Sequence, residues 1–182
     1  MRNQMESVLI LIRLLMQEKK INSDEFARSC EFTNLHHQLN YSEYKLTAFF
    51  DKIFSFYSSG PTGVLSVVFM EQNAHNQLHG QFLNDYRPTD VITFPADEED
   101  DHAGEICVSV DKAMLESGLR GIPFVEELSL YLIHGWLHLI GFNDMEEVER
   151  NCMKDEEKNC LSLIRKSCLW PDFELASPAP LK

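Results

Sequence analysis

The spacing of apolar residues predicts three elements between residues 42 and 84. Large apolar residues recur at helical spacing after Ser42, a residue type that favours the N-cap of a helix. Residues 59–63 contain two glycines and a proline and interrupt this pattern. Residues 64–70 then form a continuous apolar run, as in a buried strand. A second helix is expected over about residues 73–84. The residues expected to face the core are Tyr44, Leu46, Phe49, Phe50, Ile53, Phe54 and Tyr57 in the first helix and Leu78 and Phe82 in the second.

Further along the chain, two short strands precede two helices. Residues 91–94 and residues 105–110 have the apolar patterns of strands, with Ile106, Val108 and Val110 expected on one side of the second. A helix from Pro123 to Ile140 is apolar almost all round, so it should be central and buried. Residues 145–165 predict a charged amphipathic helix. The residues available to pack on that helix are Val148, Cys152, Leu161 and Ile164.

The ends of the chain carry weaker patterns than its middle. Residues 1–20 include an apolar run interrupted by Arg13, which is too short to span a membrane and lacks the features of a secretory signal. We interpret this run as a buried helix or strand, within a segment to about residue 40 that is a candidate extension of the fold. Residues 167–182 contain three prolines and are expected to be irregular. Residues 1–166 are therefore predicted to form a single α+β domain, with a small mixed β-sheet covered by helices and the apolar helix at its centre.

The cysteine content and the net charge indicate the cellular compartment of the protein and the kinds of ligand that it can bind. The five cysteines are odd in number and have no C-x-x-C spacing, which favours free thiols in a reducing cytoplasm over a disulfide framework. The formal net charge is −13, which opposes strong non-specific binding of nucleic acid. Much of this charge lies in acidic runs at residues 97–101, 146–147 and 155–157, which we interpret as solvated faces.

The most informative motif is a pair of histidines, His134 and His138, near the end of the apolar helix. Residues four apart project from the same helix face, so both imidazoles can bind one divalent ion. Gly141 suits the left-handed position that ends a helix, and the chain can then bring Asp144 towards the same ion. Two histidines and a carboxylate leave a coordination position open, as in catalytic metal sites. The sequence thus predicts His134, His138 and Asp144 as ligands.

The residue after His134 argues against a zinc-protease site, and the other histidines are weaker candidates for metal ligands. In zinc proteases with an H-E-x-x-H helix, a glutamate after the first histidine polarises the attacking water, whereas here that residue is Gly135. His75 and His79 are also four apart, but we place them on a polar surface without a third ligand. His102 is interpreted as an exposed loop histidine.

Three motifs resemble those of the YbeY family of bacterial endoribonucleases. Residues 134–144 (His-Gly-Trp-Leu-His-Leu-Ile-Gly-Phe-Asn-Asp) are similar to the family motif H-G-x-L-H-L-x-G-x-D-H. Residues 88–95 (Pro-Thr-Asp-Val-Ile-Thr-Phe-Pro) resemble P-T-D-V-L-S-F-P, and residues 104–106 (Gly-Glu-Ile) resemble G-D-I. The resemblance covers roughly residues 40–166.

Two positions depart from the family pattern. Asp144 stands where the family has its third histidine, and Asn143 stands where the family has an aspartate. Aspartate is a competent ligand but a harder, charged oxygen donor, so it changes the metal preference of the site. An arginine that commonly precedes the P-T-D motif corresponds to Leu83 here, and Arg87 lies nearby.

The resemblance implies a metal-dependent single-strand endoribonuclease in ribosomal RNA processing and ribosome maturation. It implies one divalent ion, expected to be zinc, and ribosomal RNA or ribosomal particles as partners, with a ribosomal protein or a GTPase as further candidates and no membrane. Neither motif nor spacing supplies a proton-transfer group, so no catalytic side chain is predicted. Two alternatives stay open: a metallopeptidase-type zinc hydrolase, and a ribosome-associated binding protein with a degenerate metal site.

Overall fold

The structure is a computed structural model that describes residues 28–57, 60–96 and 101–176. The predictions for residues 1–27, and for the tail beyond residue 176, lie outside the described residues. No helix in the described part of the chain is both long and apolar enough to cross a membrane. All five cysteines lie in that part, and each is free, as the sequence predicts.

The described residues contain a four-stranded mixed sheet in the order β1-β3-β5-β4. The strands are β1 (Arg28–Asn34), β3 (Gly63–Met70), β5 (His102–Ser109) and β4 (Val91–Phe94). Strands β1, β3 and β5 are parallel, and β4 runs antiparallel to β5 at the edge. A separate antiparallel pair joins β2 (Leu39–Asn40) to β6 (Glu174–Leu175). The mixed sheet and its helices confirm the predicted α+β class.

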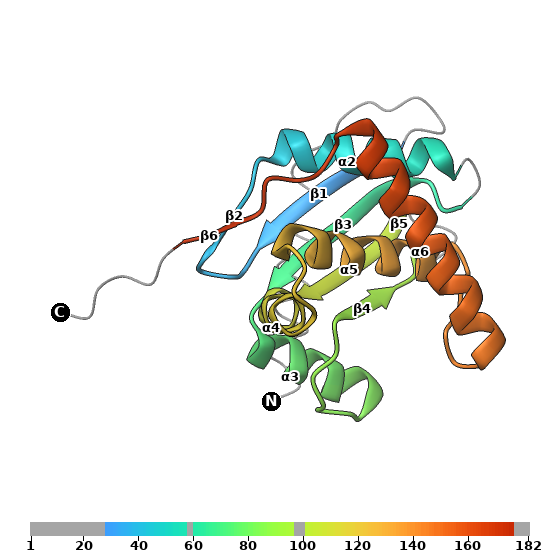
Figure 1. The fold of residues 1–182 in the computed structure, drawn as a ribbon. Helices are drawn as coiled ribbons and strands as arrows, with labels where there is room; N and C mark the ends of the chain where they lie inside the picture. Colours follow the sequence, from blue (N-terminus) through green and yellow to red (C-terminus); the bar gives the residue numbers. More distant parts are fainter. Residues whose placement is uncertain (1–27, 58–59, 97–100, 177–182) are drawn as a thin grey trace.

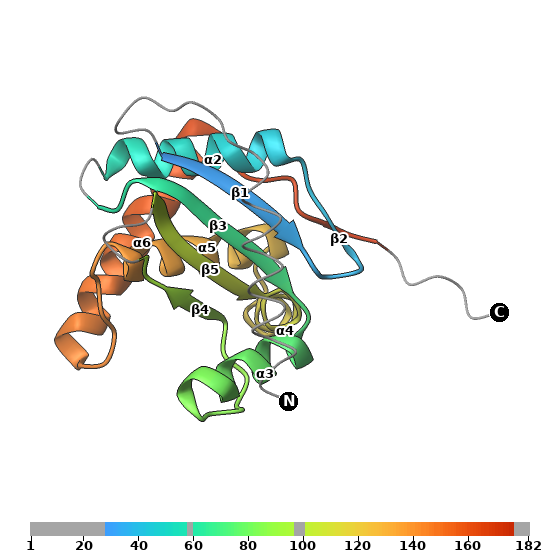
Figure 2. The same ribbon diagram turned by 180° about the vertical axis from the view of Figure 1, so that it is seen from behind.

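One face of the sheet is covered by helices α2 (Glu43–Phe56) and α5 (Phe124–Leu139), as Figure 1 shows. From behind, the strands lie in front of these helices (Figure 2). Helix α2 begins at Ser42, whose hydroxyl accepts a hydrogen bond from the Lys45 backbone N–H. Most of its predicted core positions are buried, but Tyr44 is 82% exposed, which corrects the prediction for that residue.

Helix α5 lies at the centre of the fold and is buried over most of its length, as its apolar sequence predicts. Its backbone can approach the sheet closely because residue 135 is glycine. A Cβ atom at Gly135 would lie 2.7 Å from Ile106 Cγ2 of β5 and 3.1 Å from Val91 Cγ2 of β4. This close packing places the last two turns of α5 beside β4 and β5.

The opposite face of the sheet packs against α3 (Gln72–Leu83) in a smaller apolar cluster that includes Val68, Leu78 and Ile92. Two predictions for this helix are wrong. Phe82 is 49% exposed rather than inward, and His75 is fully buried rather than on a polar surface. Leu78 and Phe82 share a helix face, but Phe82 lies in the last turn of α3, where it packs on Phe94 of β4 and stays half-exposed.

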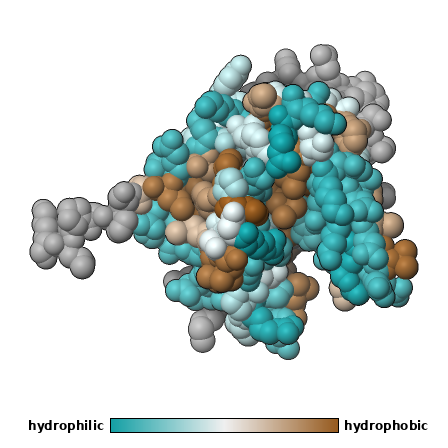
Figure 3. Space-filling model, in the orientation of Figure 1, coloured by the Kyte–Doolittle hydropathy of each residue, from teal (hydrophilic) through white to brown (hydrophobic). Residues whose placement is uncertain are grey.

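Helix α4 (Val110–Arg120), like strand β1, is a described element that the hydrophobic pattern missed. Val110, predicted as the end of a strand, is the first residue of this helix. Ser109 caps it by accepting from the Lys112 backbone N–H, and Gly121 ends it in the left-handed conformation. Its outer face carries several exposed apolar residues, which are visible as a hydrophobic patch over α4 in Figure 3. They are Met114, Leu115, Leu119 and, just beyond the helix, Ile122.

Helix α6 (Glu147–Ser167) crosses α5 and carries mostly hydrophilic side chains on its outer face (Figure 3). Of its predicted packing positions, Ile164 is buried, whereas Val148 and Cys152 are exposed. The inward face instead carries Met153 and Cys160. After α6 the chain is largely without regular structure, although Phe173 is buried in the core and β6 ties this segment to β2.

Candidate metal centre

The two histidines of the predicted site lie at the C-terminal end of α5, on one face of the helix. The helix ends where the sequence indicates: Gly141 has φ +98°, and its backbone N–H donates to His138 O. The Phe142 N–H donates to Leu137 O, which closes the turn. This turn returns the chain towards the helix and brings Asp144 beside the imidazoles.

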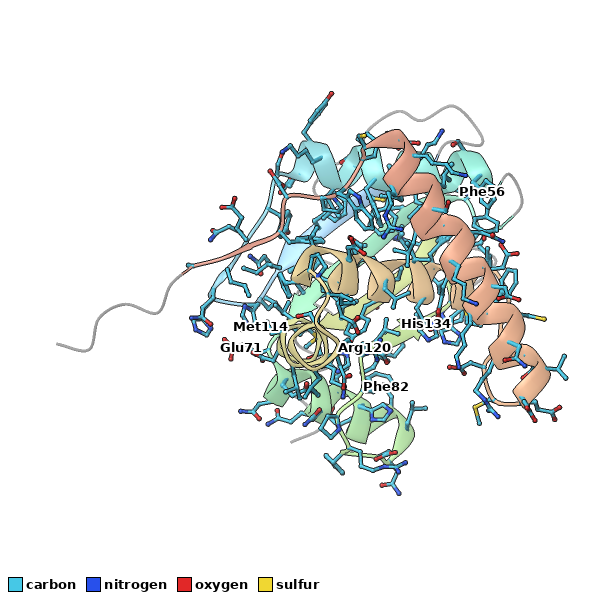
Figure 4. The ribbon with its side chains drawn as sticks, in the orientation of Figure 1. Phe56, Glu71, Phe82, Met114, Arg120 and His134 are labelled. Atoms are coloured by element: carbon cyan, nitrogen blue, oxygen red, sulfur yellow. The ribbon has the colours of Figure 1, made fainter. Side chains whose placement is uncertain are left out.

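The structure brings the three predicted ligand residues together. The Nε2 atoms of His134 and His138 are 3.0 Å apart. The Oδ2 atom of Asp144 lies 3.7 Å from His134 Nε2 and 3.9 Å from His138 Nε2. These three form the one group of candidate metal ligands found among the described residues. The carboxylate of Asp144 therefore faces both imidazoles. Figure 4 shows His134 near the middle of the face that α5 and α6 form.

The other nitrogen of each imidazole contacts a group that can only accept a hydrogen bond. His134 Nδ1 lies 2.7 Å from Glu157 Oε1, and His138 Nδ1 lies 3.0 Å from the carbonyl oxygen of Phe142. A carboxylate and a carbonyl do not donate, so both Nδ1 atoms must carry the hydrogen. In the neutral imidazoles each Nε2 atom then carries a lone pair instead of a hydrogen. The two Nε2 atoms face each other at 3.0 Å beside the Asp144 carboxylate.

This arrangement is repulsive unless a cation lies among the three atoms. Two nitrogen lone pairs and a negative oxygen all direct electron density to the same point, and only a shared proton or a metal ion can neutralise it. Fixing the tautomer through the second nitrogen is also how proteins orient histidine ligands towards metals. The residues present therefore fit a divalent ion held by His134, His138 and Asp144.

The electrostatics of the two imidazoles differ. Burial alone would lower the pKa of His134, but the hydrogen bond with Glu157 and the charges of Asp90, Glu157 and Asp144 outweigh burial, so the pKa is raised. Burial and the neighbouring His134 lower the pKa of His138, against the opposing charge of Asp144. The surroundings thus favour positive charge on His134 and oppose it on His138.

The packing at Gly135 bears on the peptidase alternative. In an H-E-x-x-H site this position holds the glutamate that polarises water. Here the Cβ direction at Gly135 points at Ile106 and Val91 of the sheet. A side chain at this position would enter the core rather than the candidate metal centre, so this helix cannot carry the usual protease base.

Sequence reasoning missed Glu157, the residue that holds His134. It lies in the acidic run 155–157, which was interpreted as a solvated face, yet its side chain is only 17% exposed. Its neighbour Glu156 also faces inward and accepts a hydrogen bond from the Tyr57 hydroxyl. A helical-spacing test could have found Glu157, because it falls on the inward stripe of Met153 and Cys160.

The two positions near the P-T-D motif lie on the surface. Leu83, at the position of the family arginine, is 64% exposed at the end of α3. Arg87 has a highly exposed side chain, and its guanidinium is bound to the carboxylate of Asp85 at 2.6 Å. Asp90, in the same segment, acts electrostatically on both His134 and His138.

Comparison with known proteins assigns this chain to a family. The family model described as "Endoribonuclease YbeY" matches residues 31–165, well over half of the chain. The chain belongs to the YbeY family. This confirms the resemblance drawn from the three motifs and extends it nine residues towards the N-terminus, from residue 40 to residue 31, so that it includes most of β1.

Curated members of the YbeY family are similar over part of the chain. Endoribonuclease YbeY of Acholeplasma laidlawii is 34% identical over 86 residues, which span 47% of this chain and 63% of that protein. The protein of the same name from Carboxydothermus hydrogenoformans is 31% identical over 122 residues, spanning 65% of this chain and 85% of that protein. A solution structure from Thermotoga maritima, 24% identical, has a TM-score of 0.55 and covers 76% of this chain and 91% of its own; it supports the fold.

Proposed function

We propose that the protein is a metal-dependent endoribonuclease that cleaves single-stranded RNA in ribosomal RNA processing and ribosome maturation. Membership of the YbeY family, whose curated members are named endoribonucleases, supports the reaction class. The site itself supports the metal. We place the activity in the cytoplasm, in keeping with the five free thiols.

The observation that carries the proposal is the pair of facing Nε2 atoms. Glu157 and the Phe142 carbonyl hold the hydrogens of both imidazoles on Nδ1, so the lone pairs converge with Asp144 on one point. Such a set of two nitrogens and one oxygen suits zinc, and it also suits harder divalent ions because one donor is a carboxylate. We therefore propose one divalent ion, with zinc as the first candidate.

Each residue has a defined part in this proposal. A divalent ion at this site supplies Lewis acidity towards a phosphoryl oxygen and lowers the pKa of water. His134 and His138 hold the ion from the rigid end of α5, and Glu157 keeps the His134 ring in place. Asp144 supplies negative charge that offsets the ion. This offset should make the centre a weaker Lewis acid than one built from three neutral histidines.

The charge of the protein favours a particular source of RNA. At a net charge of −13, the chain attracts phosphates weakly. We propose that a ribosomal particle presents the RNA strand, with a ribosomal protein or a GTPase as an additional contact. Tight, sequence-independent binding of naked RNA at physiological salt would contradict this part of the proposal.

The test combines metal content with cleavage. The purified protein should contain close to one divalent ion per chain by elemental mass spectrometry, and it should cleave an unstructured oligoribonucleotide in a chelator-sensitive way. A panel of peptides should remain intact. Cleavage of peptides but not RNA would favour a metallopeptidase. A metal-free protein that cleaves neither, yet binds ribosomal particles, would indicate a binding protein with a degenerate site.

A further inference from the structure

A pair of exposed aromatic side chains lies at the end of α3, across the edge strand β4 from α5 and the candidate metal centre. Phe82 is 49% exposed and Tyr86 is 63% exposed. We call these two residues the aromatic rim. In the view of Figure 4, Phe82 lies below His134.

Both rings are held in place by contacts on one side. The Phe82 ring packs edge-to-face on Phe94 of β4, with the centroids 4.8 Å apart. Asn84, in the left-handed conformation with φ 54°, ends α3 and turns the chain back along it. This turn lays the Tyr86 ring against the backbone at Gly80, where an added methyl group would overlap the ring. The two rings are thus ordered without being covered.

A short segment of chain, residues 86–91, leads from the rim to the part of β4 that lies against α5. Tyr86 is four residues from Asp90, so their Cα atoms are at most about 14 Å apart. Asp90 acts electrostatically on His134 and His138, and the next residue, Val91, lies against Gly135 of α5. An RNA strand bound at the metal centre has to pass the edge of β4 to contact the rim.

We infer that the aromatic rim is a base-stacking subsite that binds an unpaired nucleobase of the RNA strand. The inference rests on the proposed function, because it assumes that RNA occupies the metal centre. Aromatic side chains bind single strands without sequence preference because every base has a π-face to stack on. Double-stranded RNA cannot use such a site, because its bases are already stacked and paired.

The charge balance favours stacking over phosphate contacts here. The chain has 29 acidic and 16 basic residues, and the nearby Arg87 already pairs with Asp85. Stacking is largely independent of charge, so it lets an acidic protein hold RNA locally. The affinity for single strands should then depend weakly on salt, since the slope for single strands is about 0.7 per phosphate contacted.

The test measures the binding of a fluorescently labelled oligouridylate by anisotropy, with chelator present to prevent cleavage. Tyr86→Ala and Phe82→Ala should each weaken binding by about 5- to 150-fold, the range expected for loss of one stacked base. Tyr86→Phe should bind like the wild type. Gly80→Ala keeps both rings but displaces Tyr86, so it should weaken binding as well.

The chain offers matched controls of the same residue type. Phe56 is also 49% exposed and Tyr44 is 82% exposed, and both lie on α2, away from the rim. Figure 4 shows Phe56 on the other side of α6 from Phe82. Phe56→Ala and Tyr44→Ala should leave the affinity for the oligouridylate unchanged.

An abasic oligonucleotide of equal length separates stacking from phosphate contacts. The wild type should prefer the oligouridylate over the abasic strand, and Tyr86→Ala should lose this preference. In cleavage assays with metal present, the rim variants should raise KM while kcat is largely retained. If the wild type cleaves RNA but Tyr86→Ala and Phe82→Ala bind both strands as the wild type does, the subsite is wrong and the proposed function stands. If the wild type neither binds nor cleaves RNA, the proposed function fails, and the subsite with it.

Discussion

The chain contains two pairs of histidines four residues apart, and the two pairs have different surroundings. On α5, the Nε2 atoms of His134 and His138 face each other at 3.0 Å, and both Nδ1 atoms have acceptors. On α3, His75 is fully buried, with its Nε2 atom 3.1 Å from the carbonyl oxygen of Cys107. The Nδ1 atoms of His75 and His79 are both buried and lack hydrogen-bond partners among the described residues.

The difference shows what a metal centre needs beyond spacing. A separation of four residues puts two rings on one helix face in both pairs. Only the α5 pair has acceptors that direct both free lone pairs to one point, together with a third donor returned by a turn. In the α3 pair, Nε2 of His75 is bound to the backbone of β5, so that ring serves the packing of α3 on the sheet.

The largest expected effect follows from removing either histidine of the α5 pair. His134→Ala and His138→Ala should each reduce the bound metal to near zero. The loss of metal affinity should exceed the roughly 10- to 100-fold loss that is typical when a residue that hydrogen-bonds a metal ligand is replaced. The fold should persist, because both side chains lie at the edge of the core. His79→Ala, from the other pair, is the matched control and should keep the full metal content by elemental mass spectrometry. Equal metal in all three variants would refute the site.

The second largest effect should come from Asp144, the residue that departs from the family. Asp144→Ala should weaken metal binding in a competition titration with a fluorescent chelator, because it removes the third donor. Asp144→His should keep the metal, since it restores the family's ligand. Asp155→Ala is the control, because it removes an exposed carboxylate that pairs with Lys158, and it should leave the metal affinity unchanged.

An unchanged metal affinity in Asp144→Ala would mean that the Asp144 carboxylate lies in the turn without binding the metal. The backbone of this turn has its own support, since the Arg150 guanidinium donates to the carbonyl oxygens of Asp144 and Met145. The turn should therefore survive the substitution, and the loss of affinity can be assigned to the ligand.

Both the gains and the failures of sequence reasoning have a common physical cause. Helical and strand periodicity located α2, β3, α5 and α6, because these elements bury a continuous apolar face. The same reasoning missed α4, whose first residue, Val110, continues the alternation of the preceding strand. Periodicity shows which face is apolar, but the packing of neighbouring elements determines which apolar face is covered.

The candidate site shows the same limit. His134, His138 and Asp144 were predictable because they lie within eleven residues, where helix geometry and one turn set their positions. Helical spacing can place Glu157 on the inward face of α6, but its contact with His134 was not predictable, because it depends on how α6 crosses α5. The rim residue Phe82 was predicted to be buried for a similar reason: helical spacing places it on the same face as Leu78, but it cannot show that only Leu78 is covered.

A smaller effect is expected at Glu157, which supports the α5 pair and has no counterpart in the α3 pair. Glu157→Ala should weaken metal affinity by about 10- to 100-fold, as for other residues that orient a histidine ligand. Glu157→Gln should be milder, because the amide oxygen can still accept from Nδ1. Glu156→Ala, which removes the neighbouring contact with Tyr57, should lower stability but leave metal affinity unchanged. If Glu156→Ala and Glu157→Ala lower metal affinity equally, the effect is a general loosening of α6.

The smallest expected effect is on the pH dependence of stability and comes from His75 of the α3 pair. It distinguishes a histidine of the core from a histidine that binds metal. Burial lowers the pKa of His75 below its ordinary value, and the nearby charge of His79 lowers it further. The hydrogen bond with Cys107 and the charge of Asp90 act in the opposite direction. Because the unfolded chain binds a proton at His75 more readily than the folded protein does, stability should fall as the pH drops below about 6.5.

This loss of stability should be measurable by urea unfolding of the metal-free protein at several pH values between about 7.5 and 5. One proton contributes a slope of at most about 1.4 kcal/mol per pH unit. His75→Gln can still donate to the Cys107 carbonyl and does not titrate, so its unfolding free energy should decline less on acidification. His79→Gln removes the neighbouring imidazole but keeps His75, so it should retain most of the slope. Identical slopes in the wild type and His75→Gln would show that His75 does not control the acid stability of α3, and the comparison between the two pairs would then rest on metal binding alone.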